Sequence, residues 1–174
     1  MFAPTDLAGL PPAEQYRTLT AEARALLAGE SDRVANAANL AALIHHGLED
    51  LNWVGFYFHD GRELVVGPFQ GLPACVRIPL GKGVCGTAAV TGRTQVVADV
   101  DAFPGHIACD SASRSEIVVP LFARDGSLIG VLDVDSPRLG RFGAVDREGF
   151  EALAAIWLEA CGAGVGEGDA ALPS

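Results

Sequence analysis

The sequence predicts an α+β domain, with a central antiparallel sheet of about six strands and helices on its outer faces. Three observations lead to this prediction. Helical periodicity is confined mainly to the two ends of the chain, and the middle consists of short runs rich in β-branched and aromatic residues. No long crossover helix separates most of these runs, so an antiparallel sheet is favoured over a doubly wound parallel one.

Length and composition indicate one domain with one core, because the chain has 174 residues and 49% of them are hydrophobic. We assign residues 1–162 to this domain and residues 163–174 to a flexible, glycine-rich tail. The net charge of -10 argues against nucleic acid and anionic membrane surfaces as partners. The chain shows no leader pattern and no membrane-spanning run, which predicts a cytoplasmic protein. The four cysteines do not form a secreted disulfide scaffold, so any disulfide should be transient.

Two helices are expected before the strands, the first over residues 12–28 and the second from an N-cap at Ser31 to Leu51. The second helix has an apolar stripe at helical spacing, formed by Val34, Ala37, Ala41, Ile44 and Leu48. A last helix is expected over residues 144–161. Its apolar face consists of Phe150, Leu153, Trp157 and Cys161.

The strand candidates are residues 53–58, 64–69, 75–80, 94–100, 115–123 and 127–135. Turn residues 59–63 join the first two, and residues 124–126 join the last two. If the last two strands pair about their turn, Glu116 lies near Asp133 and Asp135. Alternation along the last strand puts Ile129, Val131, Asp133 and Asp135 on one face.

Two acidic residues on one face of a strand indicate a functional site if other parts of the protein cover that face. Asp133 and Asp135 would then be desolvated neighbours of like charge, which raises at least one pKa and creates a proton donor or a cation-binding pair. The alternative is that the strand simply emerges into water at this end. Trp53 and Tyr57 on the first strand could wall a small apolar pocket, or could belong to the core.

Cys109 is the candidate reacting thiol. It lies in DAFPGHIACDSASRSE, a segment between two strand candidates whose Gly, Pro, Asp and Ser residues predict an exposed loop. Nearby His106 or backbone amides would favour the thiolate, whereas Asp110 would oppose it. The alternative is a spare small residue in a loop.

Two further cysteines could join it. Cys85 lies in GKGVCGTAAV, at the entry to a short helix whose N-terminus would lower the thiol pKa. The glycines there do not make a phosphate loop, because the spacing and the Lys-Ser/Thr pair are missing. Cys75 stands at a strand edge. A zinc site of Cys75, Cys85, Cys109 and His106 is disfavoured because the chain has no CxxC pair, and Cys161 fits a core position.

Four segments carry a resemblance to a known family: NWVGFYF, GPFQGLPACVRIPLGKGVCG, GHIACDSASRSEIVVPL and IGVLDVDSP. In this order, over residues 16–158, the chain resembles the free methionine-(R)-sulfoxide reductases, which are GAF-domain enzymes. The resemblance implies a GAF fold and the reduction of free methionine-(R)-sulfoxide to methionine, a reaction of oxidative-stress defence. It implies no cofactor and no metal.

The resemblance also implies roles for residues. Cys109 would attack the sulfoxide sulfur and become a sulfenic acid, Cys75 would resolve it with Cys85 as an accessory thiol, and a thioredoxin-type reductant would reduce the disulfide. The substrate would be held by Glu116, Asp133, Asp135 and Trp53.

Some alternatives stay open at this point. Sequence reasoning does not decide whether Cys75 or Cys85 resolves the sulfenic acid, or which acid protonates the sulfoxide. The competing function is a non-catalytic GAF module that senses a small molecule or redox state. A homodimer is expected from family habit. One departure is Leu72, which stands where the family commonly has lysine.

Overall fold

The computed structural model describes residues 2–105 and 111–162. Cys109, His106 and the predicted tail at 163–174 lie outside the described residues. The elements in chain order are α1 (Pro12–Leu27), α2 (Arg33–Gly47), β1 (Trp53–His59), β2 (Glu63–Gly71), β3 (Arg77–Pro79), α3 (Gly83–Thr91), β4 (Gln95–Val97), η1 (Val100–Ala102), β5 (Ser115–Phe122), β6 (Leu128–Ser136) and α4 (Ala144–Ala160).

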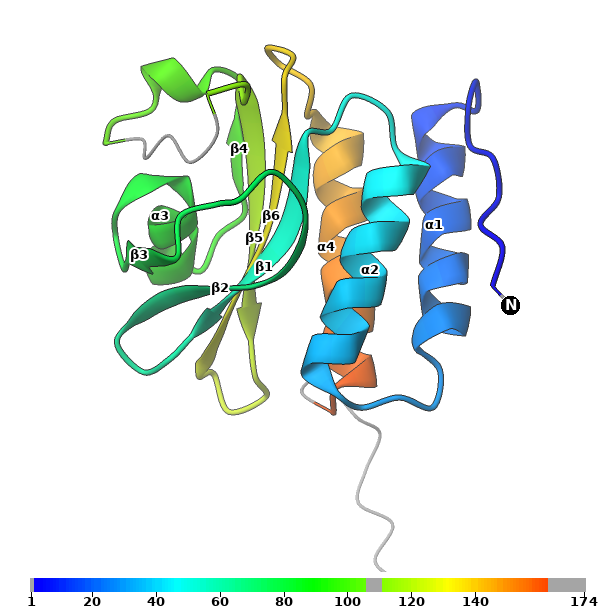
Figure 1. The fold of residues 1–174 in the computed structure, drawn as a ribbon, viewed down its shortest axis with the longest axis horizontal. Helices are drawn as coiled ribbons and strands as arrows, with labels where there is room; N and C mark the ends of the chain where they lie inside the picture. Colours follow the sequence, from blue (N-terminus) through cyan, green and yellow to red (C-terminus); the bar gives the residue numbers. More distant parts are fainter. Residues whose placement is uncertain (1, 106–110, 163–174) are drawn as a thin grey trace, which may run out of the picture.

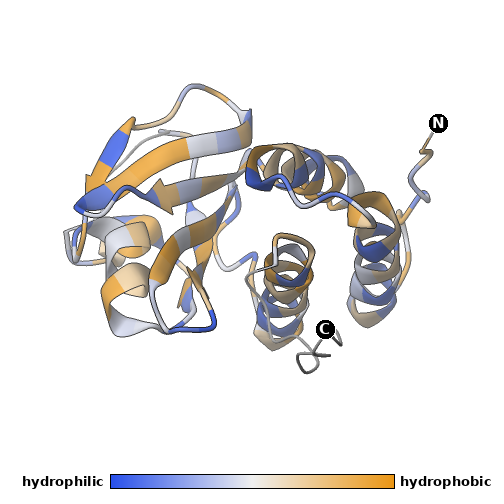
Figure 2. Cartoon of the chain, turned by 90° about the horizontal axis from the view of Figure 1, so that it is seen from below, coloured by the Kyte–Doolittle hydropathy of each residue, from blue (hydrophilic) through white to orange (hydrophobic). Residues whose placement is uncertain are grey.

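One antiparallel sheet organises the fold, which confirms the predicted architecture. Its six strands run in the order β3-β2-β1-β6-β5-β4, so β1 and β6 lie in the middle. Helices α1, α2 and α4 cover one face, and α3 lies on the other (Figure 1). Hydrophobic residues follow the strands between these two layers of helices (Figure 2). Within the described residues, no helix is long and apolar enough to cross a membrane.

Each face of the sheet has its own apolar cluster, because side chains alternate along a strand. The larger cluster, on the side of α1, α2 and α4, includes Leu40, Ile44, Phe56, Leu132, Phe150 and Trp157. The smaller one, between the sheet and α3, includes Trp53, Tyr57, Val84, Cys85, Val118 and Val131. The predicted binding residues belong to this second side.

The second helix differs from its prediction at three points. Its N-cap is Asp32, not Ser31, because the Asp32 carboxylate accepts hydrogen bonds from the amides of both Val34 and Ala35. Val34 is 58% exposed instead of lying on the apolar stripe, since the buried face is built on later residues of α2. The helix ends at Gly47, before Leu51, because the backbone at the C-cap is extended.

The strands also show two differences. Regular pairing is limited to Arg77–Pro79 in β3 and Gln95–Val97 in β4, so both edge strands are shorter than predicted. Ile129 does not share a face with Val131, because the β5–β6 register shifts at this point and Ile129 packs in the larger cluster. This irregularity is a β-bulge. Beyond it the alternation is regular, so Asp133 and Asp135 share a face with Val131 as predicted.

Candidate functional site

Cross-strand pairing places the predicted binding residues in neighbouring rows of the sheet. Trp53 of β1 lies opposite Asp135 of β6, and Asp135 lies opposite Glu116 of β5. In the next row, Gly55 of β1 lies opposite Asp133. Because β1, β6 and β5 are consecutive in the sheet, these residues form one continuous patch on the side that α3 covers.

Three stacked aromatic rings, of Trp53, Tyr57 and Phe69, form an aromatic wall beside the acids. The Trp53 ring stacks on Phe69 and on Tyr57, with ring centroids 5.2 Å and 5.7 Å apart. Its Nε1 donates a hydrogen bond of 3.1 Å to the carbonyl oxygen of Leu72. Gly55 makes this arrangement possible, since a Cβ there would lie 2.5 Å from the indole and 2.4 Å from the Cβ of Phe69. The indole is therefore fixed above the Gly55 position.

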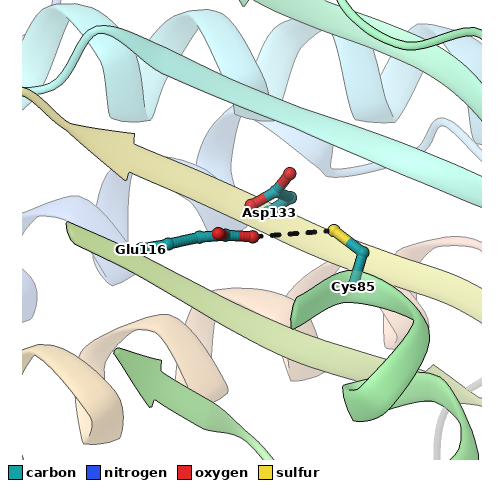
Figure 3. Close-up of side chains that lie close together, drawn as sticks. All are labelled: Cys85, Glu116 and Asp133. Atoms are coloured by element: carbon teal, nitrogen blue, oxygen red, sulfur yellow. Dashed lines mark hydrogen bonds between the residues drawn. The ribbon is translucent and has the colours of Figure 1, made fainter. Parts of the chain in front are cut away.

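Three side chains from three elements converge next to this wall (Figure 3). Cys85 reaches in from α3, and its Sγ lies 3.9 Å from Oε1 of Glu116. One ligand atom each of Cys85, Glu116 and Asp133 lies within 4.8 Å of the other two. Their exposed fractions are 4%, 6% and 6%, so the cluster is buried, while Asp135 is half-buried at its edge. The strand pairing thus brings Glu116 to the acids of β6, and α3 adds the thiol.

Burial dominates the protonation of the two innermost acids. It raises the pKa of Glu116 well above its usual range, and the negative charges of Asp133 and Asp135 raise it further. Burial also raises the pKa of Asp133 to about 6. Glu116 is therefore the acid of the pair that holds a proton more readily, and Asp133 is the one that becomes a carboxylate first. Oδ1 of that carboxylate has no hydrogen-bond partner although it is buried, an arrangement that favours a ligand carrying a donor or a positive charge.

The prediction of a low thiol pKa at Cys85 is wrong. Burial raises the pKa of Cys85 well above its usual value, and the charges of Asp133 and Glu116 act in the same direction. These effects outweigh the helix N-terminus on which the prediction depended. The pKa of Tyr57 is raised for the same reasons, burial first and the acids second. Both groups therefore keep their protons.

The described cysteines have three different environments. Cys75 is half-buried, packs against the smaller apolar cluster and is disulfide-bonded. Cys85 and Cys161 are free thiols. Cys161 lies at the C-terminal end of α4 on the other side of the sheet, where it accepts a hydrogen bond from Nδ2 of Asn36 at 3.7 Å. Cys75 and Cys85 thus share one side of the sheet, and Cys161 is remote from both.

The buried thiol and acids are also the described residues that could hold a metal ion. A thiolate with two carboxylates is a donor set that zinc accepts. Each donor would first have to lose its proton, which burial opposes. The zinc set that the sequence disfavours includes Cys109 and His106, which lie outside the described residues.

Sequence reasoning missed Gly55, Phe69 and the carbonyl of Leu72, which together orient the indole of Trp53. A signal for one of them was present. Gly55 interrupts an aromatic strand in WVGFYF, and a glycine inside a strand marks a place where another group approaches closely. The carbonyl of Leu72 leaves no signal of this kind, because any residue supplies it.

Comparisons with known proteins identify the family of the chain. The GAF domain family model matches residues 30–156, a range that includes Cys85, Glu116 and Asp133. The chain is 51% identical over 142 residues to the free methionine-R-sulfoxide reductase of Escherichia coli, which covers 82% of this chain and 86% of that protein.

Two solved structures are similar throughout. The free methionine-R-sulfoxide reductase of Neisseria meningitidis, in complex with its substrate, has a TM-score of 0.88 and 48% identity, covering 94% of this chain and 97% of that one. A Burkholderia vietnamiensis protein described as a GAF sensor has a TM-score of 0.84 and 66% identity, covering 86% of this chain and 94% of that one. The GAF fold of this chain is therefore shared with both solved structures over most of its length.

Proposed function

The chain belongs to the free methionine-R-sulfoxide reductases, a family of GAF-domain enzymes, and from this we propose that it reduces free L-methionine-(R)-sulfoxide to methionine with a cysteine thiol. The observation that carries the proposal is the buried acid pair Glu116 and Asp133 beside the indole of Trp53. It combines a proton donor, an unpartnered carboxylate oxygen and an apolar wall, which are the groups that a zwitterionic methyl sulfoxide requires.

The proposed chemistry begins at Cys109, whose thiolate attacks the sulfoxide sulfur. The oxygen passes from the substrate to Cys109, so methionine leaves and a sulfenic acid remains. The thiol of Cys75 then attacks that sulfenic acid, a disulfide forms and the oxygen leaves as water. Two electrons from a thioredoxin-type dithiol return both cysteines to thiols. The disulfide-bonded state of Cys75 supports its role as the resolving residue.

The acids have two different roles, proton donation to the sulfoxide oxygen and binding of the substrate ammonium, and their pKa values decide which acid has which role. The sulfoxide oxygen needs a proton before the S–O bond breaks, and Glu116 is the acid suited to supply it, because burial and the neighbouring acids raise its pKa well above the usual range. The substrate ammonium needs a carboxylate, which Asp133 supplies with its unpartnered oxygen, and Asp135 adds a second charge at the edge. A peptide-bound sulfoxide lacks this ammonium, so the site selects the free amino acid.

The aromatic wall accounts for the apolar end of the substrate. Trp53 and Tyr57 are both buried and stacked, so they offer a rigid surface to the methyl group. The hydrogen bond from Trp53 to Leu72 keeps the indole from turning. A sulfoxide whose oxygen faces Glu116 would thus have its methyl group on the indole, which is the basis we propose for choosing one epimer.

The partners and the location belong to the same proposal. The reductant is a thioredoxin-type dithiol protein, the enzyme works in the cytoplasm as a homodimer, and no cofactor or metal takes part. The strongly acidic charge of -10 supports a protein that avoids nucleic acid and anionic membranes.

The decisive experiment measures consumption of free L-methionine-(R)-sulfoxide with dithiothreitol, comparing wild type, Cys109→Ser and the matched control Cys161→Ser. We expect turnover by wild type and the control, and none by Cys109→Ser. The S epimer and a peptide-bound sulfoxide should be poor substrates. A folded, reduced wild-type protein without turnover would contradict the proposal.

A second function, small-molecule or redox sensing without catalysis, is favoured by the 66% identity to the Burkholderia protein described as a GAF sensor. The same assay separates the two functions. A sensor would bind methionine sulfoxide, or form the disulfide, without releasing methionine in amounts above one per protein molecule.

A further inference from the structure

We infer that Cys85 is a positioning residue, whose S–H group donates to Glu116 and directs the proton of that acid while Cys85 itself stays reduced. This inference rests on the proposed function and assigns a role to a thiol that the reaction steps leave unused.

The first step of the argument is the fixed place of Cys85. It is the third residue of α3, and the backbone around it is closed by hydrogen bonds from Gly81 N to Gly86 O at 2.9 Å and from Lys82 N to Pro79 O at 3.1 Å. A Cβ on Gly86 would lie 2.5 Å from the carbonyl oxygen of Pro79, so this turn packs directly against the end of β3. The position of the Cys85 Sγ is therefore fixed by the backbone of this turn.

The second step is the direction of the hydrogen bond. The Sγ of Cys85 lies 3.9 Å from Oε1 of Glu116, a distance suited to a thiol donor and a carboxyl acceptor. A thiolate at this point would put a second negative charge beside the carboxylate of Asp133 in a buried space. Cys85 is therefore a donor and not a nucleophile.

The third step concerns the proton of Glu116. In a protonated carboxyl group, the oxygen that accepts a hydrogen bond is the carbonyl oxygen, so a donor on Oε1 directs the proton to Oε2. Glu116 is also hydrogen-bonded to Asp133. With one oxygen fixed by Cys85, the acid is held in one protonated form. A sulfoxide oxygen that approaches Oε2 would then meet this proton directly.

The test compares Cys85→Ala, which removes the donor, with Cys85→Ser, which keeps an O–H group. The readout is the pH profile of methionine release in a single turnover, with one sulfoxide per reduced protein molecule. For Cys85→Ala we expect a rate about three- to tenfold lower, with the high-pH limb moved to higher pH, because the hydrogen bond from Cys85 lowers the pKa of Glu116. Cys85→Ser should stay close to wild type in both respects.

A resolving thiol would give a different pattern. Both variants would then release methionine with the wild-type pH profile in a single turnover, and both would fail in repeated turnover with thioredoxin. That result would overturn the inference. So would a disulfide at Cys85 in wild-type protein treated with sulfoxide and mapped by mass spectrometry, a measurement that does not depend on how the variants fold. Loss of all methionine release from wild type would instead contradict the proposed function.

Discussion

Two buried aspartates on opposite sides of the sheet show how differently one residue type is used. Asp146, on the side of α1 and α4, accepts hydrogen bonds of 2.8 Å from Tyr16 Oη, Arg141 Nη1 and the amide of Gly143. Asp133, on the side of α3, has a buried oxygen with no partner. The first aspartate joins helices to each other, and the second keeps unused binding capacity.

The two aspartates differ in their hydrogen-bond and ion-pair partners much more than in their burial. The exposed fractions are similar, 9% for Asp146 and 6% for Asp133. Asp146 has a cation beside it, since Arg141 forms an ion pair with it. Asp133 has an acid and a thiol beside it instead, so its charge is uncompensated until a ligand arrives.

The largest effect on activity is expected from Asp133→Asn. If activity did not fall, the contrast between Asp133 and Asp146 would be wrong. We expect kcat/KM for free methionine-(R)-sulfoxide to fall about 100-fold or more, because the carboxylate that we propose as the partner of the substrate ammonium is lost. The free energy of unfolding should stay unchanged or rise, since a buried, uncompensated charge is removed. Kinetics and urea denaturation measure the two quantities. Glu148→Gln, an exposed acid on α4, is the matched control and should change neither.

The opposite result is expected from Asp146→Ala. This change leaves Arg141 and Tyr16 without their buried acceptor, so we expect a loss of about 2–4 kcal/mol in the free energy of unfolding. Activity per folded molecule should persist. Glu159→Ala, which removes only the exposed 3.2 Å ion pair with Arg24, should cost far less. If Asp146→Ala lowered activity as much as Asp133→Asn, the division between the two sides would be wrong.

A smaller effect concerns pH. The pKa values of Glu116 and Asp133 are both raised in the folded protein, and for Asp133 the rise is from 3.8 to about 6, so between these values the folded state binds more protons than the unfolded state. The contribution of the pair to stability therefore falls as pH rises through this window. We expect the Glu116→Gln/Asp133→Asn double variant to gain stability relative to wild type, by about 2 kcal/mol or more, from pH 4 to pH 7. A difference that is constant with pH would contradict the raised pKa values.

Local sequence patterns predicted most of the fold, since alternation and turn residues depend on neighbours in the chain. The β5–β6 turn and its strands place Glu116 opposite Asp135 as the pattern requires. The pattern was wrong at Ile129, because a bulge depends on how two strands fit and not on one strand alone. It was also wrong at Val34, since the direction of a helix face depends on its packing partners.

The site was predictable only as a set of residues. Trp53, Glu116 and Asp133 were identified from their strands and from the family resemblance, and the structure places all three on one side of the sheet. The protonation of Cys85 was not predictable in the same way. Its helix favours a thiolate, and only the three-dimensional approach of Glu116 and Asp133 reverses that preference.

The position of the acids within the sheet sets a limit on how the site can move in time. Asp133 belongs to β6, which is paired on both sides, and Glu116 belongs to β5, which is paired with β6 and β4. Amides in such strands exchange their hydrogens with water only when large parts of the molecule open, far more slowly than an enzyme turns over. During one catalytic cycle the backbone that carries Glu116 and Asp133 therefore does not move. Any adjustment to an arriving sulfoxide has to come from the segments that connect the strands.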